Sequence, residues 1–80
     1  MAKQYKIGWE MPDDYDPSAV LQKLPSPISP QLTEIYNYKV EMDGFYFLDN
    51  LVDQSVAGHA MKLFVDEALV HRDSVSIREL

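Results

Sequence analysis

Four acidic residues gather near the N-terminus, at Glu10, Asp13, Asp14 and Asp16, between two prolines. Carboxylate oxygens at this density are the ligands that calcium and other divalent cations prefer. The segment lacks the glycine and the distal glutamate that complete an EF-hand loop. We therefore expect a solvated loop that leads into a helix cap, and a divalent-cation site is the alternative chemistry for this segment.

The two histidines, His59 and His71, both fall within the longest predicted helix. At about 100° per residue they point in directions roughly 120° apart, so they cannot share a metal ion as an i, i+4 pair would. Glu67 and His71 do have i, i+4 spacing, and a cationic imidazole is favoured near a helix C-terminus. We expect these two residues to form a stabilising pair and not a catalytic one.

Groups for nucleophilic or nucleotide chemistry are missing from the remainder of the chain. The serines lack the G-x-S-x-G context of a hydrolase nucleophile, and the three glycines are too scattered to cradle a phosphate. The chain has no cysteine, and hence no thiolate nucleophile or cysteine-ligated metal. The sequence therefore predicts a protein that is not an enzyme and holds no cofactor.

Charge and hydropathy narrow the range of partners. Thirteen acidic residues against seven basic ones give a net charge of −6, and no basic stripe offsets it, which disfavours nucleic-acid binding. No stretch approaches the ~18 consecutive apolar residues of a membrane span, and the N-terminus has no apolar core of a signal peptide. We expect a cytoplasmic protein without a membrane partner.

The clearest structural signal is a hairpin between residues 36 and 48, in which two alternating strands flank Asp43-Gly44. Asp-Gly favours a two-residue type I′ turn, because both central residues of that turn need a positive φ. This turn would place Met42 opposite Phe45. The inner face of the hairpin would then carry Tyr38, Val40, Met42, Phe45 and Phe47, and the outer face would carry Tyr46 and Leu48.

Similar patterns place the other elements. Residues 5–11 alternate and stop at Pro12, while the Asp16-Pro17 pair starts a short helix over residues 18–24 that Pro25 ends. A Pro-rich connection over residues 25–30 follows. The remaining elements are strands over residues 33–42 and 45–49, a long helix over residues 52–71 and a strand over residues 74–80, with Val75 and Ile77 pointing inward.

The order strand–helix–strand–strand–helix–strand predicts one α+β domain over residues 1–80. It is the order of the ferredoxin-like fold, an antiparallel sheet with both helices on one face. The alternative is a β-meander with the long helix packed across it.

The long helix is apolar around an unusually wide arc. One stripe, formed by Ala57, Ala60, Met61, Phe64 and Ala68, suits close packing on a sheet. Further apolar residues extend the arc on both sides of that stripe, beyond what one sheet face can cover. The short helix could supply the cover through Val20, Leu21 and Leu24, or a partner could supply it.

We therefore expect a small acidic module that acts through protein contacts, including self-association. The alternative is a regulatory domain that binds a small ligand or a metal ion. The candidate partner surface consists of Tyr46, Leu48, Val56, Leu63, Val65 and Leu69.

Overall fold

A computed structural model describes all residues from 1 to 80 and contains four strands and two helices in the predicted order. They are β1 (Lys3–Gly8), α1 (Ser18–Leu21), β2 (Tyr36–Glu41), β3 (Gly44–Asp49), α2 (Gln54–His71) and β4 (Ser76–Glu79). Neither helix combines the length and the apolar character that crossing a membrane requires.

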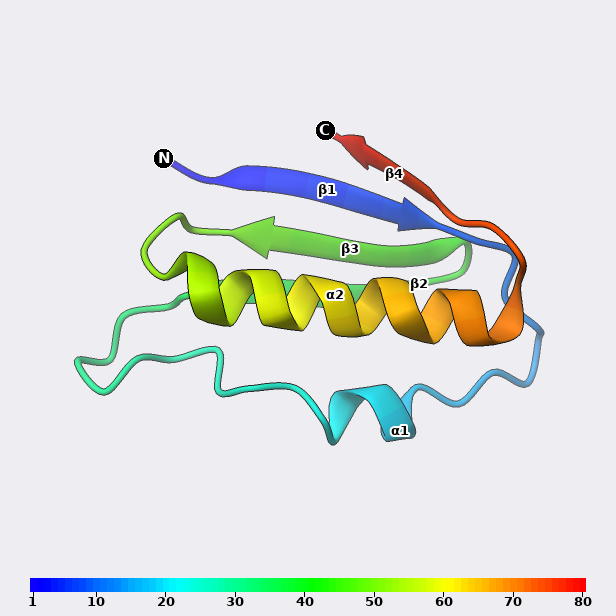
Figure 1. The fold of residues 1–80 in the computed structure, drawn as a ribbon, viewed down its shortest axis with the longest axis horizontal. Helices are drawn as coiled ribbons and strands as arrows, with labels where there is room; N and C mark the ends of the chain where they lie inside the picture. The colour runs from blue at the N-terminus through cyan, green and yellow to red at the C-terminus, as the bar shows by residue number, and fades with distance from the viewer.

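The strands form a single antiparallel sheet in the order β2-β3-β1-β4 (Figure 1). Strand β1 pairs with β3 on one side and with β4 on the other, and β2 pairs only with β3, so β2 and β4 are the edges. The predicted small α+β domain with a four-stranded antiparallel sheet is thus confirmed.

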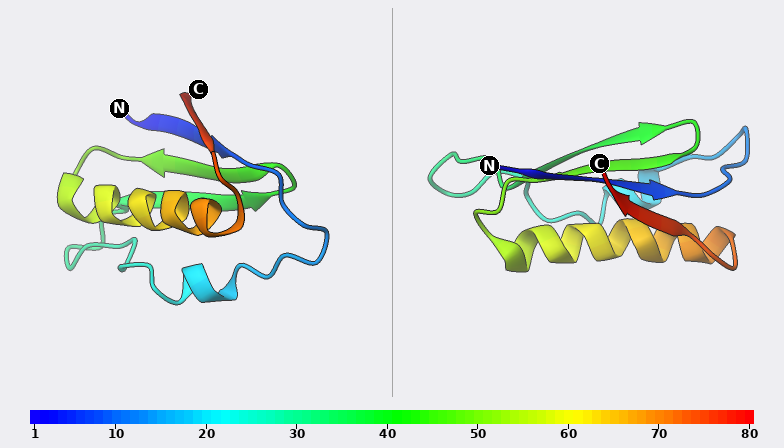
Figure 2. Two further views of the ribbon diagram at one scale, coloured as in Figure 1. Left: turned by 45° about the vertical axis from the view of Figure 1, so that its right-hand side comes forward. Right: turned by 90° about the horizontal axis from the view of Figure 1, so that it is seen from above.

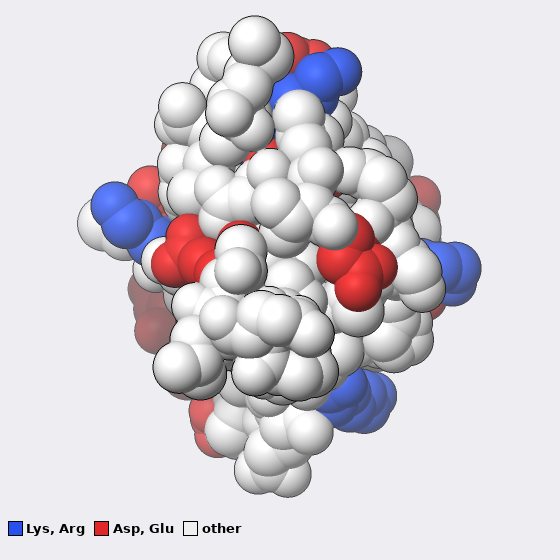
Figure 3. All heavy atoms as spheres, turned by 90° about the vertical axis from the view of Figure 1, so that its left-hand side faces the viewer, with Lys and Arg blue, Asp and Glu red and all other residues white.

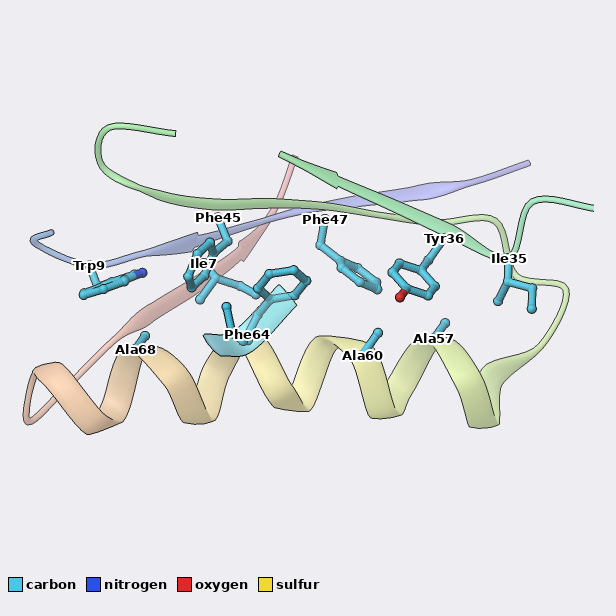
Figure 4. Close-up of a cluster of buried hydrophobic side chains, with 11 residues drawn as sticks. Ile7, Trp9, Ile35, Tyr36, Phe45, Phe47, Ala57, Ala60, Phe64 and Ala68 are labelled. Atoms are coloured by element: carbon cyan, nitrogen blue, oxygen red, sulfur yellow. The ribbon is translucent and has the colours of Figure 1, made fainter. Parts of the chain in front are cut away.

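Helix α2 lies along one face of this sheet and closes the core (Figure 4). Phe64 is fully buried at the centre, with its ring 4.8 Å from that of Phe45 and 6.2 Å from that of Phe47. Small side chains let the helix approach the sheet on either side of Phe64, as the alanine stripe predicted. The buried hydrophobic residues are Ile7, Trp9, Val20, Ile35, Tyr36, Phe45, Phe47, Ala57, Ala60, Phe64 and Ala68.

The start of α2 is fixed by Asp53, which occupies the N-cap position. Its carboxylate accepts a hydrogen bond from the Val56 amide at 3.2 Å. The helix therefore begins at Gln54 and not at Val52, which lies outside it and is 55% exposed. A cap of this kind satisfies one of the amides that the first helical turn leaves unpaired.

The first helix is shorter than predicted, because α1 ends at Leu21 instead of Leu24. Beyond it the hydrogen bonds are of the 3₁₀ type, which link residues three apart: Lys23 N donates to the Val20 carbonyl and Leu24 N to the Leu21 carbonyl. Pro25 has no amide proton and disfavours helical backbone at the preceding residue, which accounts for the early end. Asp16 accepts the Ser18 amide at 2.9 Å as expected, although Pro17 occupies the capping position.

The predicted type I′ turn at Asp43-Gly44 is wrong. Strands β2 and β3 pair Glu41 with Gly44, so Met42 and Asp43 form the turn, and neither has a positive φ. Met42 is consequently 95% exposed instead of inward. The pairing is displaced by two residues, which leaves each side chain on its predicted face because strand side chains alternate with a period of two.

Gly44 is needed for a different reason. It pairs with Gly8 of β1, its φ is +144°, and a Cβ atom there would lie 2.1 Å from the Ile7 carbonyl oxygen. Close backbone approach inside the sheet, and not turn geometry, requires glycine at this position.

Two terminal strands also differ from their predicted limits. Strand β1 spans Lys3–Gly8, because the chain leaves the sheet at Trp9, whose ring stacks against His71 at 5.4 Å. Strand β4 starts only at Ser76. Ile77 lies opposite the buried Ile7 on the helix side of the sheet, yet it is 48% exposed because it is on an edge that α2 does not cover.

Candidate functional site

The open face of the sheet carries Tyr46 and Leu48, as predicted, and both are half-buried. The Tyr46 hydroxyl donates to Gln4 Oε1 at 2.8 Å, and the Lys39 ammonium lies 5.6 Å from the centre of the Tyr46 ring. Lys6 on the same face forms ion pairs with Glu41 and Asp43, both at 2.5 Å. The hydrogen bond from Lys6 lowers the pKa of Asp43. This face is polar and internally paired, so it offers little free apolar surface to a partner.

Val56 and Leu63, the next candidate residues, lie on the flank of α2 that faces the Pro-rich segment and α1. Both are half-buried and pack against the core. Further along the same flank, Glu67 accepts a hydrogen bond from the Tyr15 hydroxyl at 2.6 Å. The chain itself therefore covers part of this flank, for example through Val20, which is 1% exposed.

Glu67, Tyr15, His71 and Trp9 form a cluster at the C-terminal end of α2. His71 Nε2 lies 3.7 Å from Glu67 Oε2, which confirms the predicted pair. Burial, together with the Glu67 hydrogen bond, raises the pKa of Tyr15 well above its usual value, so the phenol stays protonated as a donor. The side chains pack on one another and close the core at this end.

Val65 and Leu69 lie on the opposite flank of α2, which faces β4. Val65 is half-buried and Leu69 is 44% exposed. Seen from the β4 edge, β4 and the connection that leads to it cross only the C-terminal end of α2 (Figure 2, right). Val65 also packs against the core, so Leu69 is the exposed member of this pair. We call Val65, Leu69 and Ile77 of β4 the open flank. The two candidate pairs of the long helix thus lie on opposite flanks, and Leu69 is the exposed residue among the four.

A groove of about 560 Å³ lies between the Pro-rich segment and the start of α2, and we call it the end groove. Ile35 and Val56 contribute buried or half-buried apolar surface to it, and Ile28 and Val52 are more exposed. Asp53 is the charged residue among those that line it. Its volume lies within the ~300–1,000 Å³ range of binding pockets.

Hydrogen bonds tie the two sides of this end together. Asn50, in the loop between β3 and α2, donates its backbone amide to the Ile35 carbonyl at 3.1 Å. Its side-chain amide donates to the Glu34 carbonyl at 3.1 Å and to Glu34 Oε1 at 2.9 Å. These bonds hold the loop against the Pro-rich side, so the groove is preformed.

Two leucines at this end adopt left-handed backbone conformations, with φ of +64° at Leu32 and +62° at Leu51. They are the non-glycine residues of the chain with a positive φ. Leu32 follows a turn in which its amide donates to the Ser29 carbonyl at 2.8 Å, and its side chain is 85% exposed. Glycine or asparagine normally occupies such positions.

The surface at this end of the molecule carries few charges. Acidic side chains lie in its middle, and lysine and arginine side chains are near its margins (Figure 3). Sequence reasoning missed this region, although Ile28 and Leu32 are apolar residues that no predicted helix or strand included. Elsewhere, the acidic residues near Pro12 do not converge, and no group of three or more histidine and carboxylate side chains could hold a metal ion.

Comparison of the chain with models of protein families, with curated proteins and with solved structures finds no match in any of the three.

Proposed function

We propose that the protein is a small non-enzymatic module that acts through protein contacts and self-associates through its open flank. The observation that carries this proposal is the exposure of two apolar side chains, Leu69 of α2 and Ile77 of β4, which are 44% and 48% exposed. Soluble monomers seldom expose contiguous apolar patches larger than a few hundred Å², so a partner contact that includes both residues would remove them from water.

We also propose that the fold is ferredoxin-like. The strand order β2-β3-β1-β4, with every neighbouring pair antiparallel, supports this proposal, as do the two crossovers through α1 and α2. The short α1 accounts for the asymmetry of the molecule, since it covers one flank of α2 and leaves the other open.

A second copy fits the open flank because β4 is an edge strand with unpaired backbone groups on the same side. Antiparallel pairing of two β4 strands about a twofold axis requires opposed residues of equal parity, since directly opposed side chains share a face. Placing Ile77 opposite Ile77 of a second copy satisfies this condition and opposes Arg78 with Ser76. A register centred on Arg78 would oppose this residue with itself, which is electrostatically unfavourable.

Strand pairing alone buries too little surface for a stable dimer, which needs at least ~1,000 Å² in total. In the proposed dimer, Val65 and Leu69 of α2 contribute surface in addition to Ile77 of β4, so helix and strand both take part. Charge opposes the association, because each copy carries −6. Self-association should therefore strengthen with added salt, which screens repulsion over a Debye length of about 10 Å at 0.1 M.

Sedimentation velocity of single-site lysine variants tests the proposal. We expect wild type to sediment as a dimer at about 100 μM, and Leu69→Lys and Ile77→Lys to sediment as folded monomers. Val70→Lys is the matched control, because Val70 adjoins Leu69 in α2 and is 78% exposed. Lysine lowers the net negative charge, so dissociation cannot be attributed to added repulsion. A monomeric wild type, or equal dissociation by Val70→Lys, would overturn the proposal.

Lysine substitutions on the two flanks of α2 should have different effects. Lysine at Val56 or Leu63 places a charge against half-buried surface under α1 and the Pro-rich segment, so it should lower the melting temperature. Lysine at Leu69 should change association more than stability.

A further inference from the structure

Two leucines on strained backbone are next to lining residues of the end groove in the sequence: Leu32 lies between Gln31 and Thr33, and Leu51 precedes Val52. A left-handed conformation costs a non-glycine residue of order 1–3 kcal/mol, and strain of this kind tends to occur at ligand clamps and switches. Leu32 adds to this cost an 85% exposed apolar side chain that gains almost no burial within the chain.

We infer that the end groove binds a short segment of a protein partner that inserts apolar side chains flanked by lysine or arginine. This site is separate from the open flank, and it does not depend on self-association.

The apolar part of the recognition follows from the lining. Ile35 and Val56 contribute apolar surface to the groove, Val52 and Ile28 are exposed beside it, and Leu32 lies between two lining residues, Gln31 and Thr33. A volume of about 560 Å³ lies within the range of ligand pockets and leaves room for inserted side chains. Inserted apolar anchors of this kind usually dominate the affinity of an interface.

The charge of the partner follows from what surrounds the groove. Asp53 lines it, and Glu34 lines a smaller depression that shares Thr33 and Val52 with it. No lysine, arginine or histidine lines either one. Together with the net charge of −6, this arrangement favours a cationic partner and repels an acidic one.

The backbone of the Pro-rich segment argues against recognition by strand addition. Pro25, Pro27 and Pro30 have no amide proton, and the amides of Ser29 and Leu32 already donate within the chain. The partner must therefore be held by side-chain insertion and charge. The prolines also keep the groove rigid, which reduces the entropy lost on binding.

Panning a phage library of random 12-residue peptides on the full chain tests this inference. We expect enriched peptides to contain apolar residues next to lysine or arginine, and to shift the amide resonances of residues 25–35 and 51–56 in ¹⁵N spectra. Their affinity should fall as the salt concentration rises. Failure to enrich any peptide, enrichment of acidic peptides, or shifts confined to other surfaces would overturn the inference.

Leu32→Gly separates recognition from stability. Glycine relieves the left-handed strain, so the melting temperature should stay the same or rise by a few degrees, whereas peptide affinity should fall about tenfold or more. Val52→Glu should weaken binding similarly, and Val70→Glu is the matched control outside the groove. Unchanged affinity in Leu32→Gly and Val52→Glu would overturn the inference. Leu69→Lys should bind the peptide normally, so failure of the self-association proposal would be seen separately.

Discussion

Replacing Gly44 with alanine should destabilise the fold severely, although it adds a single methyl group. The new Cβ would lie 2.1 Å from the Ile7 carbonyl oxygen and 3.0 Å from Gly8 Cα. Ordinary contacts between carbon atoms are about 3.5–4.0 Å, so β1 and β3 would have to separate by more than about 1 Å at this point. Both contacts are to backbone, which cannot rotate away as a side chain would.

The expected loss in the free energy of unfolding has two parts. Holding alanine at a φ of +144° costs of order 1–3 kcal/mol. Separating the strands weakens about two ladder hydrogen bonds, each with a net contribution of ~1 kcal/mol. The sum is about 3–5 kcal/mol, against a total stability of ~4–12 kcal/mol for 80 residues.

Gly58→Ala is the matched control, because nothing lies within 4 Å of a Cβ atom built at Gly58. The same substitution there should stabilise α2 by up to ~1 kcal/mol. Urea unfolding can be followed by the fluorescence of Trp9, the single tryptophan, which is 6% exposed in the core. If the two variants unfold within about 1 kcal/mol of each other, the close approach of β1 to Gly44 is wrong.

Three further predictions concern the core, the cap of α2 and acid stability. Phe47→Ala should lower the free energy of unfolding by about 3–5 kcal/mol and Tyr46→Ala by much less, and equal losses in urea would refute the assignment of the two sheet faces. Asp53→Ala should cost about 1 kcal/mol and Asp53→Asn less, as measured by thermal melts. The hydrogen bond from Lys6 lowers the pKa of Asp43 in the folded protein. The stabilising contribution of the ionised Asp43 is therefore present above pH ~3.9, the value for the unfolded chain, and is lost as pH falls through the lower pKa of the folded protein. Asp43→Asn should therefore flatten the acid side of a plot of urea midpoint against pH, and an unchanged slope would contradict this.

The side-chain faces of the sheet were predictable from the sequence because alternation survives an error in register. Phe45 and Phe47 are inward in the predicted and in the observed pairing, which differ by two residues. The alanine stripe of α2 was equally clear, since a helix that packs closely on a sheet needs small residues beside a large one such as Phe64. These features depend on periodicity within one element.

Features that depend on a third segment were not predictable. The glycine of the Asp-Gly pair suggested a turn, but its role is set by β1, which lies 36 residues earlier in the sequence at its partner Gly8. The prolines around α1 marked its ends but did not show that the helix stops at Leu21. The uncovered edge at Ile77 likewise follows from where α2 lies across the sheet.

The end groove was not predictable for the same reason, because its two sides come from separate segments that tertiary contacts bring together, among them the hydrogen bonds of Asn50 and the burial of Ile35. Gly44 and Leu32 both occupy positions where the local sequence pattern does not explain the residue type. At Gly44 a contact inside the chain, with the Ile7 carbonyl, explains the departure. At Leu32 the chain supplies no such contact, since the side chain is 85% exposed on a left-handed backbone where glycine would be more stable. A residue that costs stability and gains almost no packing inside the fold is best explained by a contact outside it, which is why we place recognition of a second protein at this groove.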